Sequence, residues 1–80
     1  MIDINVLITS SGVASAVNVI SALKKSKKFN VKIHATDMDQ DAVGLYIADD
    51  YSIISPSNHP NYLDEILEII ERKKINFVFP

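Results

Sequence analysis

Apolar residues recur along the chain in two alternating periods, and this pattern predicts the element order β-α-β-α-β-α-β. Short runs of β-branched and aromatic residues predict strands over residues 4–9, 31–36, 51–54 and 75–79. Helical spacing predicts a helix from Val13 to the lysines before residue 29, a short helical turn over 42–48, and a third helix around Leu63 to Ile70. Such alternation with short loops is typical of one α/β domain with a parallel sheet.

The two longer predicted helices each carry an apolar stripe along one side. The stripes are Val13, Ala16, Val17, Ile20 and Leu23 in the first, and Leu63, Ile66, Leu67 and Ile70 in the second. Acidic residues open the latter helix and basic residues close it, which matches the helix dipole at both ends. Each helix is therefore expected to pack one face against the sheet.

Right-handed crossovers restrict how the strands can be ordered. We predict a Rossmann-like three-layer unit with a four-stranded parallel sheet in the order 3-2-1-4, the first two helical segments on one face and the third helix on the other. The strand at 4–9 is apolar on both faces and should be covered on both. The strand at 31–36 has a polar face at Lys32, His34 and Thr36, so it is expected to pack on one side, with His34 at the surface.

Composition narrows the class of protein. Eighty residues make one domain, which is too short for a complete enzyme, and the absence of cysteine removes disulfides and thiolate metal sites. A net charge of −2 argues against a nucleic-acid partner. No secretory signal and no apolar run of membrane-spanning length occurs, so we expect a cytoplasmic protein with no membrane partner and no metal site.

The first strand-to-helix turn carries the candidate binding residues. Ser10, Ser11, Gly12 and Val13 lie between a strand and a helix N-terminus, where free N–H groups and the dipole attract anions. In a sheet of this order, ligands bind beyond the carboxyl ends of the strands, at the switch point between the first and fourth. Of the dinucleotide glycine fingerprint, Gly12 is the one match. A tight turn capped by serine is the alternative interpretation.

Asp37 and Asp39 follow the second strand and extend this candidate site. An acid about 20 residues beyond the glycine turn can bind a ribose hydroxyl in dinucleotide folds, and Asp37 lies near that distance from Gly12. A solvated acidic turn is the alternative. The spacing of Asp37, Asp39 and Asp41 also suggests a calcium loop, but the required glycine and glutamate positions hold alanine. No catalytic residues are assigned.

Several segments together resemble the N-terminal (pre-ATP-grasp) domain of ATP-grasp ligases, especially those similar to the carbamoyl-phosphate synthase large chain. The segments are Thr36-Asp37-Met38-Asp39, Gly44-Leu45-Tyr46-Ile47-Ala48-Asp49, Pro56, Asn58-His59-Pro60-Asn61-Tyr62-Leu63 and Ile75-Asn76-Phe77-Val78-Phe79-Pro80. The resemblance covers essentially residues 1–80. The first turn departs from the glycine-rich form common in the family, because Ser10 and Ser11 stand where small residues or glycines are usual.

The resemblance implies a domain that is not catalytic alone and forms the substrate side of a larger enzyme. The parent protein would be an ATP-dependent ligase whose downstream ATP-grasp domain holds ATP and magnesium, with no cofactor in this part. It would activate a small-molecule carboxylate or bicarbonate as an acyl phosphate and pass it to an amine or other nucleophile. A nucleotide-binding fragment of another Rossmann-type enzyme and a stand-alone interaction domain remain as alternatives.

The predicted strand at 75–79 lies at the end of the sequence and is apolar on both faces. One helix can cover only one of these faces, and an open apolar edge is a template for another chain. We therefore expect self-association through strand 75–79 or its uncovered face, or marginal stability of the monomer.

Overall fold

The computed structural model describes residues 2–79, which form four strands and three helices in the predicted order. The elements are β1 (Ile2–Ile8), α1 (Ala14–Lys24), β2 (Phe29–Asp37), α2 (Val43–Ile47), β3 (Asp50–Ile53), α3 (Tyr62–Arg72) and β4 (Phe77–Phe79). Across residues 2–79, none of the helices has the length and apolar character that a bilayer crossing requires.

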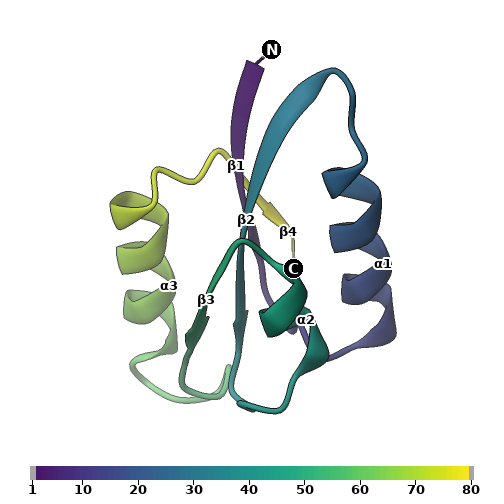
Figure 1. The fold of residues 1–80 in the computed structure, drawn as a ribbon. Helices are drawn as coiled ribbons and strands as arrows, with labels where there is room; N and C mark the ends of the chain where they lie inside the picture. The colour runs from purple at the N-terminus through teal and green to yellow at the C-terminus, as the bar shows by residue number, and fades with distance from the viewer. Residues whose placement is uncertain (1, 80) are drawn as a thin grey trace.

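The sheet confirms the predicted topology. Its strand order is β3-β2-β1-β4, and every neighbouring pair is parallel. Val6 lies opposite Ile33 on one side and Phe77 on the other, which fixes the register of the central strands. Figure 1 shows α1 and α2 on one side of the sheet and α3 on the other, as expected for right-handed crossovers.

Side chains of β1 alternate between two separate cores. Val6 and Ile8 pack with Ile20 of α1, whereas Leu7 packs with Ile66 and Ile69 of α3. Because successive strand residues point to opposite faces, one apolar strand supplies both layers. The prediction that β1 is covered on both faces is confirmed.

His34 and Thr36 on the polar face of β2 are buried, although Lys32 is exposed, which contradicts the prediction that this strand packs on one side and that His34 is a surface residue. His34 is 4% exposed and Thr36 is fully buried. β2 lies between β1 and β3, so its polar side chains pair with neighbouring strands. The Thr36 hydroxyl donates to the Ile8 carbonyl at 3.3 Å, and His34 Nε2 lies 2.8 Å from Ser52 Oγ. Hydrogen bonding of this kind makes burial of polar groups tolerable.

The buried side of α3 differs from the predicted stripe. Ile66 and Ile69 are buried, while Leu63 and Leu67 are 63% and 52% exposed. The helix turns its Ile66–Ile69 side toward Leu7, which leaves both leucines on the outside.

β4 begins at Phe77, two residues later than predicted, because the residues before it close α3. Lys74 has a φ of 52°, and the Ile75 N–H donates to the Ile70 carbonyl at 3.0 Å. A hydrogen bond of this span, beside a residue in the left-handed conformation, is the Schellman motif that commonly ends an α-helix. Asn5 Nδ2 donates to the carbonyls of Lys73 and Lys74 at 3.3 and 3.1 Å, which ties the end of α3 to β1.

Candidate functional site

The turn after β1 places its two serines in different surroundings. Ser10 is exposed and has a φ of 53°, a left-handed conformation that reverses the chain. Ser11 is fully buried. Its hydroxyl donates to the Ile8 carbonyl at 3.1 Å and its N–H to the Thr36 carbonyl at 3.2 Å. Ser11 therefore holds the turn against the sheet and does not present its hydroxyl to a ligand.

The carboxylate of Asp37 links this turn to the loop after β2. Its Oδ2 accepts the Gly12 N–H at 2.9 Å, and its Oδ1 accepts the Asp39 N–H at 3.0 Å. Asp39 in turn accepts the N–H of Asp41 at 2.9 Å. The sequence predicted that N–H groups near the start of α1 would attract an external anion. The N–H of Gly12 is instead bonded to the carboxylate of Asp37.

A close approach between backbones fixes α2 against the same turn. The Gly44 N–H donates to the Ser11 carbonyl at 3.0 Å, and a Cβ at residue 44 would lie 2.1 Å from that oxygen. Only glycine fits such an approach. This role of Gly44 could not be predicted, because nothing local in the sequence distinguishes it from an ordinary helical glycine.

A cavity of about 250 Å³ opens beyond the carboxyl ends of β1, β2 and β3, and we call it the carboxyl-edge cavity. Its lining comprises Ser10, Val13, Asp37, Met38, Ile54, Ser55, Pro56, Ser57 and Tyr62. Three of the predicted site residues therefore meet here, namely Ser10, Val13 and Asp37. Ser11, Gly12 and Asp39 do not line the cavity.

The loop after β3 supplies lining residues that sequence reasoning missed. Ser55 is held there by Glu65 of α3, whose carboxylate accepts both its N–H and its hydroxyl at 3.1 Å. The position of this loop could have been predicted from the sequence, because the carboxyl ends of parallel strands share one edge of the sheet and the loop after β3 starts at that edge. The cavity accordingly extends toward β3, whereas the sequence predicted a site between β1 and β4.

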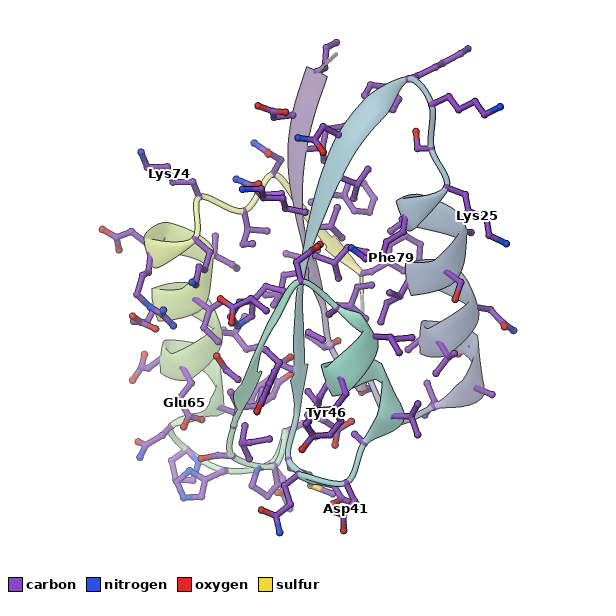
Figure 2. The ribbon with its side chains drawn as sticks, in the orientation of Figure 1. Lys25, Asp41, Tyr46, Glu65, Lys74 and Phe79 are labelled. Atoms are coloured by element: carbon purple, nitrogen blue, oxygen red, sulfur yellow. The ribbon has the colours of Figure 1, made fainter. Side chains whose placement is uncertain are left out.

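The charge of this cavity comes from Asp37, the one charged side chain among its described lining residues. Hydroxyls from Ser10, Ser57 and Tyr62 and apolar surface from Val13 make up part of the rest. Figure 2 shows Asp41 and Glu65 toward this end of the molecule and Lys74 toward the opposite end. Within residues 2–79, no three histidine, aspartate or glutamate side chains are grouped as a metal site.

A four-stranded parallel sheet in the order β3-β2-β1-β4, with helices on both faces and a small cavity at its carboxyl edge, defines the class as a Rossmann-like α/β domain. Comparison with protein families makes the assignment narrower. Residues 6–80 match the model described as the N-terminal domain of PylC-like proteins, which covers nearly the whole chain. The chain belongs to this family of pre-ATP-grasp N-terminal domains.

The family assignment agrees with the coarser part of the sequence-based resemblance. A domain of this family implies a downstream ATP-grasp domain in the parent protein. The more specific likeness to the carbamoyl-phosphate synthase large chain is not what the family model matches. No curated protein matches the chain.

Proposed function

We propose that this chain forms the substrate-side domain of an ATP-dependent, cytoplasmic ligase, and that the carboxyl-edge cavity contacts an acid that also bears an amine. The family membership supports the ligase, because pre-ATP-grasp domains accompany the domain that activates a carboxylate. Asp37 is the observation that carries the choice of substrate. Its carboxylate gives the cavity a negative charge, which attracts an ammonium group and repels a bare anion.

In this proposal, an amino acid lies with its ammonium group toward Asp37 and its carboxylate toward the downstream domain. ATP and magnesium are held by that domain, where the carboxylate becomes an acyl phosphate. The described residues do not suit a triphosphate, since the Gly12 N–H is already bonded to Asp37. We therefore assign this chain only binding and orientation of the substrate.

Bicarbonate is the alternative acid, as in a carbamoyl-phosphate-synthase-like reaction. A cavity of about 250 Å³ is far larger than bicarbonate needs, since a water molecule occupies about 30 Å³ of liquid. A bare anion would also meet the carboxylate of Asp37. Both features favour the amino acid over bicarbonate.

The test measures ADP release by the protein that contains the downstream domain, with bicarbonate and with a panel of amino acids as the acid. We expect an amino acid to stimulate ADP release. Asp37→Asn should raise the KM for that amino acid about tenfold and leave the KM for ATP unchanged, because one charged contact is worth about 1–2 kcal/mol. Asp41→Asn is the control, since Asp41 lies in the same loop but does not line the cavity.

Melting temperatures of both variants check that the loop still folds. Stimulation by bicarbonate alone, with Asp37→Asn kinetically silent, would remove the amino-acid proposal. Failure of every acid to stimulate ADP release would contradict the ligase itself.

A further inference from the structure

A second cavity lies at the opposite end of the sheet from the carboxyl-edge cavity. It measures about 630 Å³ and is formed by β1, the first halves of β2 and β3, and the end of α3. Its lining includes Lys32, His34, Asp50, Lys73 and Lys74. We call it the amino-end cavity.

Positive charge exceeds negative charge around the amino-end cavity. The two carboxylates that line it are already paired. Asp49 binds Lys24 Nζ at 2.6 Å and accepts the Ile33 N–H at 2.8 Å, and Asp50 binds Lys73 Nζ at 2.6 Å. Lys32 and Lys74 therefore remain without a salt-bridge partner among the described residues.

The C-terminus of α3, which would normally repel an anion, is covered here. Asn5 Nδ2 donates to the carbonyl of Lys73, the residue that caps α3, and to the carbonyl of Lys74 just beyond it, so the exposed end of the helix already has a donor. The negative end of the dipole is thereby reduced where it meets the cavity.

A buried histidine provides an independent sign of a ligand. The side chain of His34 is 5% exposed, and its Nδ1 is buried without a hydrogen-bond partner in the part of the chain that the structure describes. Its Nε2 is occupied by Ser52 Oγ at 2.8 Å. An acceptor close to Nδ1 is the carboxylate of Asp50, whose Oδ2 is 3.4 Å away and also bonded to Lys73. At 3.4 Å this contact is longer than a normal hydrogen bond and its oxygen is shared with Lys73, so Nδ1 is poorly satisfied, which is uncommon for a buried polar group.

We propose that the amino-end cavity binds a phosphate group between Lys32, Lys74 and His34, with the half-exposed Asp50 carboxylate displaced from His34 Nδ1. Asp50 is the chain's own anion at this position. An incoming phosphate carries more negative charge and more acceptor oxygens than a carboxylate. It can therefore satisfy Lys73 and the His34 ring while drawing in the two unpaired lysines. This site is separate from the carboxyl-edge cavity and does not depend on the proposed ligase activity.

The experiment titrates this chain with inorganic phosphate and follows amide and histidine-ring resonances by NMR, with chloride at equal ionic strength as the reference. We expect saturable shifts at residues 32–34 and 73–75 and at the His34 ring. Ribose 5-phosphate, titrated in the same way, distinguishes a phosphate ester from free phosphate. Tighter binding of the ester assigns the site to a phosphorylated metabolite, and tighter binding of phosphate assigns it to the free ion.

Charge variants test the position of the phosphate. Lys32→Gln with Lys74→Gln should weaken binding about tenfold, because two charge-assisted contacts are lost. Lys27→Gln with Lys28→Gln is the matched control, since it removes the same charge from exposed lysines that do not line the cavity. Asp50→Asn should tighten binding severalfold, because a competing anion is removed.

The spectra themselves show whether each variant is folded. Shifts that chloride reproduces, or equal binding by the Lys32/Lys74 and Lys27/Lys28 variants, would overturn the site. Unchanged binding in Asp50→Asn would contradict the contact with His34 Nδ1.

Discussion

At the scale of single residues, this domain depends on a few contacts between parts of the backbone that are distant in sequence. Gly44 and Ser11 touch through a hydrogen bond that leaves no room for a Cβ. Asp37 joins the turn after β1 to the loop after β2. These contacts position the carboxyl-edge cavity, and each can be tested by a small change.

Gly44→Ala should destabilise the domain by about 2–4 kcal/mol, because its Cβ must push away the Ser11 carbonyl. Gly12→Ala is the comparison. Its Cβ would meet Ala42 Cβ at 3.1 Å and Asp37 Oδ2 at 3.3 Å, which the neighbours can absorb by small shifts. Urea denaturation of both variants measures the difference, and equal losses would argue against the close approach at Gly44.

His34 should make stability depend on pH. Burial lowers the pKa of His34 from its ordinary value of 6.5, although the nearby Asp50 raises it; Lys73 and Arg72 lower it further. The unfolded chain therefore binds a proton more readily than the folded one. Stability is fully present above pH 6.5 and is lost as pH falls through the lowered pKa of the folded state.

Urea midpoints at about pH 7.5 and about pH 5.5 measure this loss. His34→Leu should flatten the dependence in that interval, whereas His59→Gln, a change at an exposed loop histidine, should retain it. At lower pH a second loss is expected, because the hydrogen bond from Lys73 lowers the pKa of Asp50 from 3.8. An equally steep profile in His34→Leu would show that another group is responsible.

At the scale of elements, α3 shows how hydrophobic spacing can predict a helix and yet misplace its buried side. Four apolar residues, Leu63, Ile66, Leu67 and Ile70, form an acceptable stripe on their own. The adjacent Ile69 makes a second, overlapping stripe with Ile66, and packing against Leu7 selects it. The period identifies a helix, but two faces of similar hydrophobicity leave its rotation to tertiary contacts.

Ile69→Ala should therefore cost about 2–4 kcal/mol, since it leaves a cavity under α3. Leu67→Ala should change the free energy of unfolding by less than about 0.5 kcal/mol, because more than half of that side chain is already in solvent. Thermal or urea unfolding of the two variants distinguishes the faces. A larger loss of stability in Leu67→Ala than in Ile69→Ala would support the buried face predicted from the sequence.

At the scale of the whole molecule, the two ends of the sheet differ in charge. The cavity at the carboxyl ends of the strands is lined by one carboxylate, whereas the amino-end cavity has unpaired lysines. The two edges of the sheet are alike in being open within the described residues, since β3 and β4 are the outer strands. β4 is the more apolar of the two, with Phe77, Val78 and Phe79 all exposed.

Self-association of the chain through β4 stays a prediction, because β4 is an outer strand with exposed apolar side chains. Sedimentation of the chain over a range of concentrations should show association that Phe77→Lys removes, because a charged edge strand resists pairing. Ile53→Lys is the matched control on the other edge strand, where a side chain of similar exposure receives the same charge. A well-folded monomer at high concentration, or equal effects of both variants, would contradict association through β4.

The sequence by itself determined the element order, the parallel sheet, its strand order and the side of the sheet on which each helix lies. These follow from local period and from the handedness of crossovers, which are properties of neighbouring residues and of chirality. It also located the turn at Ser10 to Val13 and the acid at Asp37, because turns and strand ends are marked by local composition.

Only the tertiary structure decided which of those residues line the carboxyl-edge cavity. The Ser11 hydroxyl is buried in a hydrogen bond to the Ile8 carbonyl, and His34 is buried because β2 lies inside the sheet between β1 and β3. The carboxyl-edge cavity and the amino-end cavity are each lined by residues from three or more segments of the chain. Burial and charge balance at such places are sums over segments far apart in the chain, so no local pattern contains them.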